Sequence, residues 1–139
     1  MNNAINNLQI TIKKAMLNDT LNGGFPYLAE TLKIAGVTIN EWTLPSCQSL
    51  YVTNDGTVVI QGQPLVTGIS DVPRFDRFAL IEALRDDQSG KSTFPIFLAN
   101  IWKAGVVKYV VDFTARHVTY IGCNGEFYIE PYPEVFLID

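Results

Sequence analysis

The stretch Phe25–Val37, FPYLAETLKIAGV, returns 69 positions later as Phe94–Val106, FPIFLANIWKAGV. Both copies place a proline in the first turn of an expected helix, where it pre-sets the backbone and gives up an N–H that the helix does not use. Each then reaches a glycine, Gly36 or Gly105, which can take the left-handed conformation that ends a helix. Two helices with the same start and the same end are therefore predicted.

The correspondence extends past these helices. Positions 25–60 align with 94–129 without a gap, and eight of the 36 aligned residues are identical. After each glycine the apolar residues alternate, which is typical of a strand with one buried face, and this places Trp42 and Val111 at matching inward positions. The shared helix signals and strand pattern predict an internal duplication.

Further elements follow and precede each copy. Asp55-Gly56 and Asn124-Gly125 readily supply the positive φ values of a hairpin turn, so two more antiparallel strands are expected in each copy. Asp76 is the expected N-cap of a preceding helix that runs to about Gln88. In the first copy, residues 2–17 have the pattern of an amphipathic helix, with one apolar side formed by Ile5, Leu8, Ile12, Ala15 and Met16.

These elements predict an α+β fold of two tandem repeats, at about residues 2–60 and 75–130, each with two helices and a three-stranded antiparallel meander. The repeats are expected to pack as a single domain, residues 1–139, around a pseudo-twofold axis, because such a unit cannot bury its apolar face alone. Two arrangements of the meanders are compatible with this pattern: they join edge to edge as one six-stranded sheet, or they stack as two layers. The C-terminal EPYPEVFLID is expected to form a strap across the body.

Composition excludes several classes of partner. The chain of 139 residues has 10 basic and 14 acidic side chains and a formal net charge of −4, so it is not expected to bind nucleic acid. It has neither an export signal nor an apolar run long enough to span a membrane, and a cytoplasmic, soluble protein is predicted. Cys47 and Cys123 are expected to be free thiols.

Nearly the whole chain also resembles a known family. The likeness rests on GGFPYLAETLKIAGVTINEWTLPSCQSLYV, GQPLVTGI, FDRFALIEALRDDQSGKSTFPIFLANIWKAGVVKY and VDFTARHVTYIGCNGEFYIEPYP, which together reach from Gly23 to Pro133. They are similar to a bacterial family of unknown function whose members are often labelled phage envelope protein. The resemblance implies no catalytic residues, and we interpret the label as a trace of prophage-borne members.

Two reactive side chains fall in matching turns. Cys47 lies between the first and second expected strands, and His117, the single histidine, lies in the corresponding turn of the second copy. If the pseudo-twofold axis brings these turns together, the imidazole could activate the thiol. The alternative is an ordinary turn with a partly buried cysteine and a solvent-facing histidine, which the absence of a third orienting group favours.

Other candidate residues lie on the expected strands. Glu41 and Asp112 fall on the solvent side, where paired carboxylates can transfer protons but usually only add solubility. Tyr51, Tyr120 and Tyr128 form a candidate binding surface, although packing alone also accounts for tyrosines on a sheet. With one histidine, two cysteines and no ligand spacing between them, no metal site is predicted.

The function stays open between two classes. The preferred one is a noncatalytic interaction or ligand-binding protein, whose partner is another protein or a small ligand and which forms a homodimer through a strand edge or the aromatic face. The alternative is a small thiol-dependent enzyme that uses Cys47 and His117. No cofactor is predicted for either class.

Overall fold

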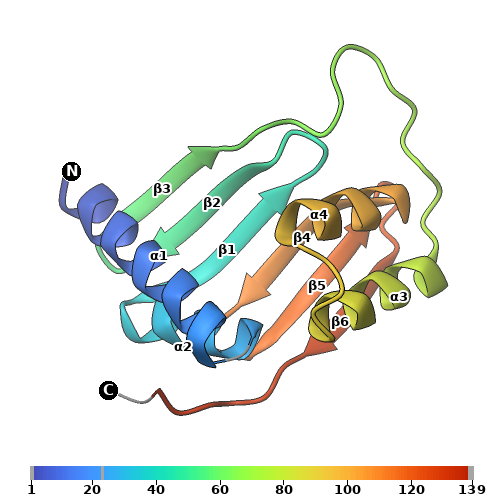
Figure 1. Cartoon of the computed structure of the whole chain (residues 1–139). Coiled ribbons are helices and arrows are strands. Elements are labelled where there is room, and N and C mark those ends of the chain that lie inside the picture. Colours follow the sequence, from blue (N-terminus) through green and yellow to red (C-terminus); the bar gives the residue numbers. More distant parts are fainter. Residues whose placement is uncertain (1, 23, 138–139) are drawn as a thin grey trace.

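The computed structural model describes residues 2–22 and 24–137, and within them the chain forms four helices and one six-stranded antiparallel sheet (Figure 1). The α+β fold, with two successive units of two helices and a meander, is confirmed. In chain order the elements are α1 (Asn2–Asn22), α2 (Phe25–Ile34), β1 (Val37–Thr43), β2 (Gln48–Thr53), β3 (Gly56–Gln61), α3 (Arg77–Gln88), α4 (Phe94–Lys103), β4 (Val106–Asp112), β5 (His117–Gly122) and β6 (Phe127–Pro131).

The two meanders join edge to edge, in the order β3-β2-β1-β4-β5-β6. At the junction of β1 with β4, Glu41 pairs with Val110, and these two residues are equivalent under the 69-residue offset. The neighbouring pair Trp42–Tyr109 is matched on the other side of Glu41 by Asn40–Val111. The pairing is therefore symmetric about the middle of the sheet, as a pseudo-twofold axis requires.

The first turn of each meander repeats an uncommon backbone conformation. Cys47 and Arg116 occupy equivalent positions, and both have a φ of 59° without being glycine. Positive φ values are uncommon for residues with a side chain. The shared geometry supports the internal duplication, which stays a prediction.

The predicted ends of α2, α3 and α4 are confirmed, whereas α1 continues to Asn22, beyond the predicted residue 17. Gly36 and Gly105 follow α2 and α4 with φ values of 101° and 91°. The Asp76 carboxylate accepts a hydrogen bond of 3.0 Å from the Ala79 N–H and caps α3. These local signals act within one turn of helix, so neighbouring elements are not needed to produce them.

Helix α1 differs from its predicted pattern. Leu8 and Ala15 are buried, but Ile5 and Met16 are 43% and 61% exposed, so the predicted apolar side was too wide. The helix packs mainly on α2, and its main contact with the sheet is at the edge strand β3. A narrow apolar stripe on α1 is therefore enough for these contacts.

All four helices lie on one face of the sheet (Figure 1). The pair α1 and α2 contacts the β3 and β1 side, whereas α4, which packs on α3, contacts β4. The largest fully buried side chains are Leu80, Ile101, Val106 and Phe113. Each helix pair thus covers its own half of the sheet.

The C-terminal residues 132–137 run as a strap beside the turn between β4 and β5 (Figure 1). The Tyr132 N–H donates a 3.1 Å hydrogen bond to the Arg116 carbonyl, and the Tyr132 ring packs edge-on against Phe25 at 5.2 Å. Arg116 also forms ion pairs with Glu30 at 3.5 Å and with Glu134 at 3.3 Å. The strap is therefore tied to both the sheet and α2.

Candidate functional site

A cleft of about 1190 Å³ lies between the helices and the inner face of the sheet. One wall is formed by α1 and α2, and the opposite wall by the end of α3 and the start of α4. The residues Ala15, Gly90 and Ser92, which line it, are small, so they leave space between the two helix pairs. Its volume is slightly above the roughly 300–1,000 Å³ of common small-molecule pockets.

Aromatic rings form the floor of this cleft. Trp42 and Tyr109 are stacked with centroids 6.0 Å apart and planes inclined by 10°, and Tyr109 lies 5.6 Å from Tyr120. Phe94, from the start of α4, meets the Trp42 ring edge-on at 5.3 Å. Alternation along β1, β4 and β5 brings the strand residues to one face, because every second side chain points the same way.

Asn40 fixes the orientation of the indole. The Trp42 Nε1–H donates a 2.9 Å hydrogen bond to Asn40 Oδ1, and Asn40 Nδ2 donates one of 3.1 Å to the Leu50 carbonyl. Asn40 is buried, so these bonds satisfy an amide that would otherwise be costly in the interior. The Trp42 ring is therefore held in place at the cleft.

The hydroxyls of Tyr109 and Tyr120 make no hydrogen bond to any other residue described in the structure. Both residues are buried and line the cleft. Burial raises the pKa of both phenols well above the ordinary value, so both are neutral at physiological pH. The cleft thus contains two hydroxyls whose hydrogen-bonding capacity is left for water or a ligand.

Glu130, on β6, closes one corner of the cleft and ties that strand to α3. Its carboxylate accepts hydrogen bonds from Arg85, from Gln88 at 2.8 Å and from Tyr128 at 2.7 Å. Partial burial raises the pKa of Glu130, but the hydrogen bonds from these three groups outweigh it and leave the pKa below its ordinary value. This carboxylate is an ionised structural link.

The three candidate tyrosines take different places. Tyr51 and Tyr120 line the cleft, whereas Tyr128 does not. Tyr128 instead donates to Glu130, and the Arg77 guanidinium lies 4.7 Å above its ring. The expected aromatic surface is thus divided: Tyr51 and Tyr120 lie in the cleft beneath the helices, and Tyr128 lies outside its lining.

The structure does not bring Cys47 and His117 together. Cys47 follows the end of β1, where Thr43 pairs with Lys108, while His117 pairs with Asp112 at the other end of β4. At roughly 3.3 Å per residue, those two positions on β4 are about 13 Å apart. The two turns therefore lie at opposite ends of the sheet (Figure 1).

The surroundings of Cys47 and of His117 also argue against a catalytic pair. Cys47 is 3% exposed, and burial raises the pKa of its thiol. The Gly62 N–H donates a 2.9 Å hydrogen bond to the Cys47 carbonyl, which holds the linker over the turn. His117 Nδ1 is buried and has no hydrogen-bond partner among the described residues. Among the residues that the structure describes, neither side chain has an activating neighbour of the kind that a thiol enzyme needs.

Glu41 and Asp112 lie on the outer face of the sheet, away from the cleft. Glu41 forms a 3.3 Å ion pair with Lys108. Asp112 accepts hydrogen bonds from the backbone N–H groups of Thr114 and Ala115 and so shapes the following turn. Both carboxylates have structural partners, and they do not converge on a common site.

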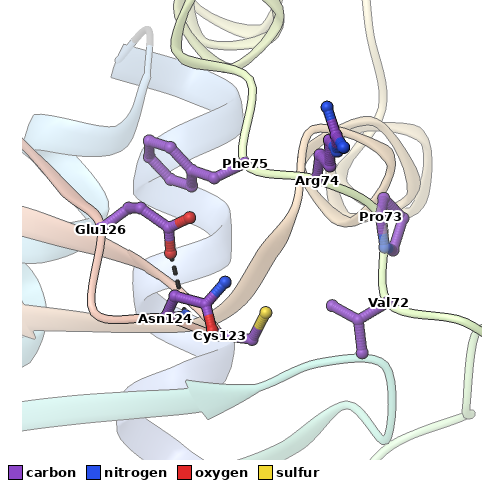
Figure 2. A pocket seen from close by; sticks show the side chains of 7 residues that line it. All are labelled: Val72, Pro73, Arg74, Phe75, Cys123, Asn124 and Glu126. Atoms are coloured by element: carbon purple, nitrogen blue, oxygen red, sulfur yellow. Dashed lines mark hydrogen bonds between the residues drawn. The ribbon is translucent and has the colours of Figure 1, made fainter.

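A second hollow, of about 300 Å³, lies outside the helix–sheet interface. Figure 2 shows its lining side chains coming from residues 72–75 before α3 and from the turn between β5 and β6. The Asn124 N–H donates a 2.9 Å hydrogen bond to Glu126, and Cys123 has an exposed free thiol. Over the described residues, no group of histidine, cysteine and carboxylate side chains is arranged to hold a metal.

Sequence reasoning missed several cleft residues, among them Tyr109, Phe94 and Asp87. The alternation along β4 placed Tyr109 on the inner face, and the aromatic residue at the start of α4 was visible in the repeat. Neither signal shows that the helices above leave a space. A cleft depends on distances between elements, which periodicity does not contain.

The fold and the site define an α+β protein with an antiparallel sheet, helices on one face and an aromatic cleft beneath them. None of its described helices is both long and apolar enough to cross a bilayer. The chain belongs to the family described as protein of unknown function (DUF1398), whose model matches residues 13–131.

Mycobacterial relatives are similar to almost the entire chain. Uncharacterized proteins of Mycobacterium tuberculosis and Mycobacterium bovis are 49% identical to it over 135 residues, covering 97% of this chain and 82% of the relative. The predicted family of unknown function is thus confirmed, whereas the phage envelope label stays a prediction. These descriptions assign no activity and supply no catalytic residue.

Proposed function

We propose that this protein binds a small molecule in the aromatic cleft. The observation that carries the proposal is a preformed space of about 1190 Å³ with aromatic rings along its floor. Small-molecule sites are concave and mostly apolar, with a few polar groups that set orientation. Here Tyr109 and Tyr120 supply those groups, because their hydroxyls lack a partner among the described residues.

We propose that the cleft binds its ligand without catalysing a reaction. Histidine and cysteine are the side chains that most often titrate near neutral pH in proteins. The described lining of the cleft contains neither. Glu130 is engaged by three donors, and its pKa is lowered by them, so it is poorly suited to accept a proton at neutral pH. Such a lining favours binding of a ligand that the protein does not convert.

Filling the cleft is expected to abolish ligand binding. A chemically diverse library of acidic, neutral and basic small molecules is screened by thermal shift, and hits are titrated by calorimetry. Leu28 lies on α2, is half-buried and lines the cleft, so Leu28→Trp places a larger side chain in the space. A ligand at 100 times its Kd stabilises the wild type by about 2.7 kcal/mol, and this gain should vanish in the variant.

The matched control is Ile34→Trp, on the same helix. Ile34 is 67% exposed and does not line the cleft, so this variant should keep wild-type affinity. Unfolding of both variants without ligand shows whether the fold is retained. A library without any stabilising compound, or hits that bind Leu28→Trp as tightly as wild type, would contradict the proposal.

We also propose that two copies of the chain pair through the outer face of the sheet. Val59, Phe127 and Ile129 on this face are 52%, 59% and 46% exposed, although an uncovered sheet face is normally polar. Near its centre Glu41 and Lys108 lie side by side, so a twofold-related copy can set each opposite its counter-charge. A second copy is therefore the partner that this face fits.

Val110→Lys tests this homodimer. Val110 lies on the outer face beside Glu41, and a lysine there puts a long charged side chain, which is costly to desolvate, in the middle of the proposed contact. Sedimentation equilibrium should give a dimer for the wild type and a monomer for Val110→Lys. Ile34→Lys, on the exposed side of α2, should remain dimeric; a wild type that is monomeric at high concentration would end the proposal.

A further inference from the structure

Two hydroxyl groups lie close together on the floor of the cleft. Tyr109 and Tyr120 occupy paired positions of β4 and β5, and their ring centroids are 5.6 Å apart. Both side chains line the cleft and are buried, and neither hydroxyl bonds to another residue that the structure describes. A buried hydrogen-bonding group that lacks a partner is costly, so a ligand that bonds to these hydroxyls gains free energy there.

Both tyrosines keep their protons at neutral pH. Burial is the main cause of the raised pKa of each phenol, and the negative charge of Asp87 adds to it in both. A neutral phenol retains an O–H group that it can donate to a carbonyl oxygen. A carbonyl oxygen has two lone pairs, so a single one can accept a hydrogen bond from both hydroxyls.

The described lining of the cleft offers no ready counter-charge to an ion. It contains no lysine and no arginine, and an anion would also meet the negative field of the carboxylates. Those carboxylates have partners of their own: Glu130 is bound by Arg85, and Asp87 Oδ1 lies 3.4 Å from Ser92 Oγ. A charged group that leaves water for a mainly apolar space without its own partner loses much of its solvation free energy.

Building on the proposed function, we infer that the ligand is a neutral, mostly apolar molecule of several rings, whose carbonyl-type oxygen accepts hydrogen bonds from Tyr109 and Tyr120. Apolar side chains such as Phe97 and Val111 surround the remaining surface of the ligand, and Trp42 offers a ring contact. A volume of about 1190 Å³ has room for several fused rings. The two hydroxyls then determine which polar group the cleft accepts.

The test uses four pyrenes with the same ring system: methyl pyrenyl ketone, ethylpyrene, pyrenecarboxylate and pyrenylmethylammonium. The ketone is neutral and has an acceptor oxygen, ethylpyrene is neutral without one, and the other two are an anion and a cation. Fluorescence titration of each into the full chain gives its affinity. The ketone should bind about 10-fold more tightly than either ion.

Tyr109→Phe combined with Tyr120→Phe removes both hydroxyls and keeps both rings. This double variant should bind the ketone about 3- to 10-fold more weakly than wild type does, and ethylpyrene with less than about a 2-fold change. Because neither hydroxyl has a protein partner among the described residues, the variant should be no less stable than wild type in a urea titration without ligand.

Tyr128→Phe is the matched control. Tyr128 pairs with Tyr120 across the neighbouring strands, but it does not line the cleft and its hydroxyl donates to Glu130. Its loss should cost some stability and change the affinity for the ketone by less than about 2-fold.

Three results would overturn the inference: either ion binding as tightly as the ketone, the double variant weakening the ketone and ethylpyrene equally, or no binding of the ketone. The broader proposal is decided separately. A library compound that stabilises the wild type but not Leu28→Trp would support small-molecule binding whatever the pyrenes do.

Discussion

The fragment of residues 1–61, produced alone, is expected to show no cooperative unfolding transition. It contains α1, α2 and the meander β1–β3, but it lacks β4, with which β1 pairs along five residue positions. Without the second half, Trp42 loses its stacking on Tyr109 and the inner edge of β1 is exposed. A unit of this size with one half-covered face buries too little apolar surface to offset its conformational entropy.

Circular dichroism during a urea titration measures this outcome. Fragment 1–61 should give a shallow, sloping change, and an equimolar mixture with fragment 62–139 should recover a sigmoidal transition, because the two fragments can rebuild the β1–β4 pairing. The mixture is the control for damage caused by cutting the chain. A monomeric 1–61 fragment with a sharp transition would show that the halves do not depend on each other.

Gly105→Ala is expected to destabilise the protein by about 3 kcal/mol or more. Gly105 has a φ of 91°, in the left-handed region that a side chain disfavours by about 1–2 kcal/mol. An added Cβ would also lie 2.5 Å from the Arg74 carbonyl oxygen and 2.5 Å from the Phe75 Cα. Both are backbone atoms, so the contact is relieved only by moving the segment that leads into α3.

The equivalent glycine of the first repeat is the internal control. Gly36 has a φ of 101°, but a Cβ there meets the Asn54 side chain, at 2.7 Å, and not a backbone atom. The exposed Asn54 can rotate away, so Gly36→Ala should cost only the conformational term of about 1–2 kcal/mol. Urea denaturation of both variants gives the difference. Equal losses would show that the contact with residues 74–75 carries no weight.

Prediction from sequence worked best where the signal is local. The proline and glycine at the two ends of α2 and α4, and the Asp76 cap, act within one helical turn, and the structure has each of them. Prediction was weaker for α1. More apolar positions were assigned to its buried side than its contact with α2 covers. The periodicity of a helix states which side is apolar, but its neighbours decide how much of that side is buried.

The candidate site followed the same division. Tyr51 and Tyr120 were found because they occupy matching positions of the two repeats, and both line the cleft. The sequence placed Cys47 and His117 in equivalent turns, and the twofold arrangement then sends equivalent turns to opposite ends of the sheet. Two residues at equivalent positions of the repeats therefore lie far apart unless both are close to the pseudo-twofold axis.

The amino-acid sequence by itself determined the order of the elements, the ends of α2, α3 and α4, and the inner face of each strand, because these depend on φ preferences and side-chain periods within a few residues. Only the tertiary structure decided that β1 and β4 join the meanders into one sheet and that the helix pairs stand apart over it. Both features depend on the packing of segments distant in sequence. The cleft is lined by residues of both pairs, so it depends on distances that no single segment sets.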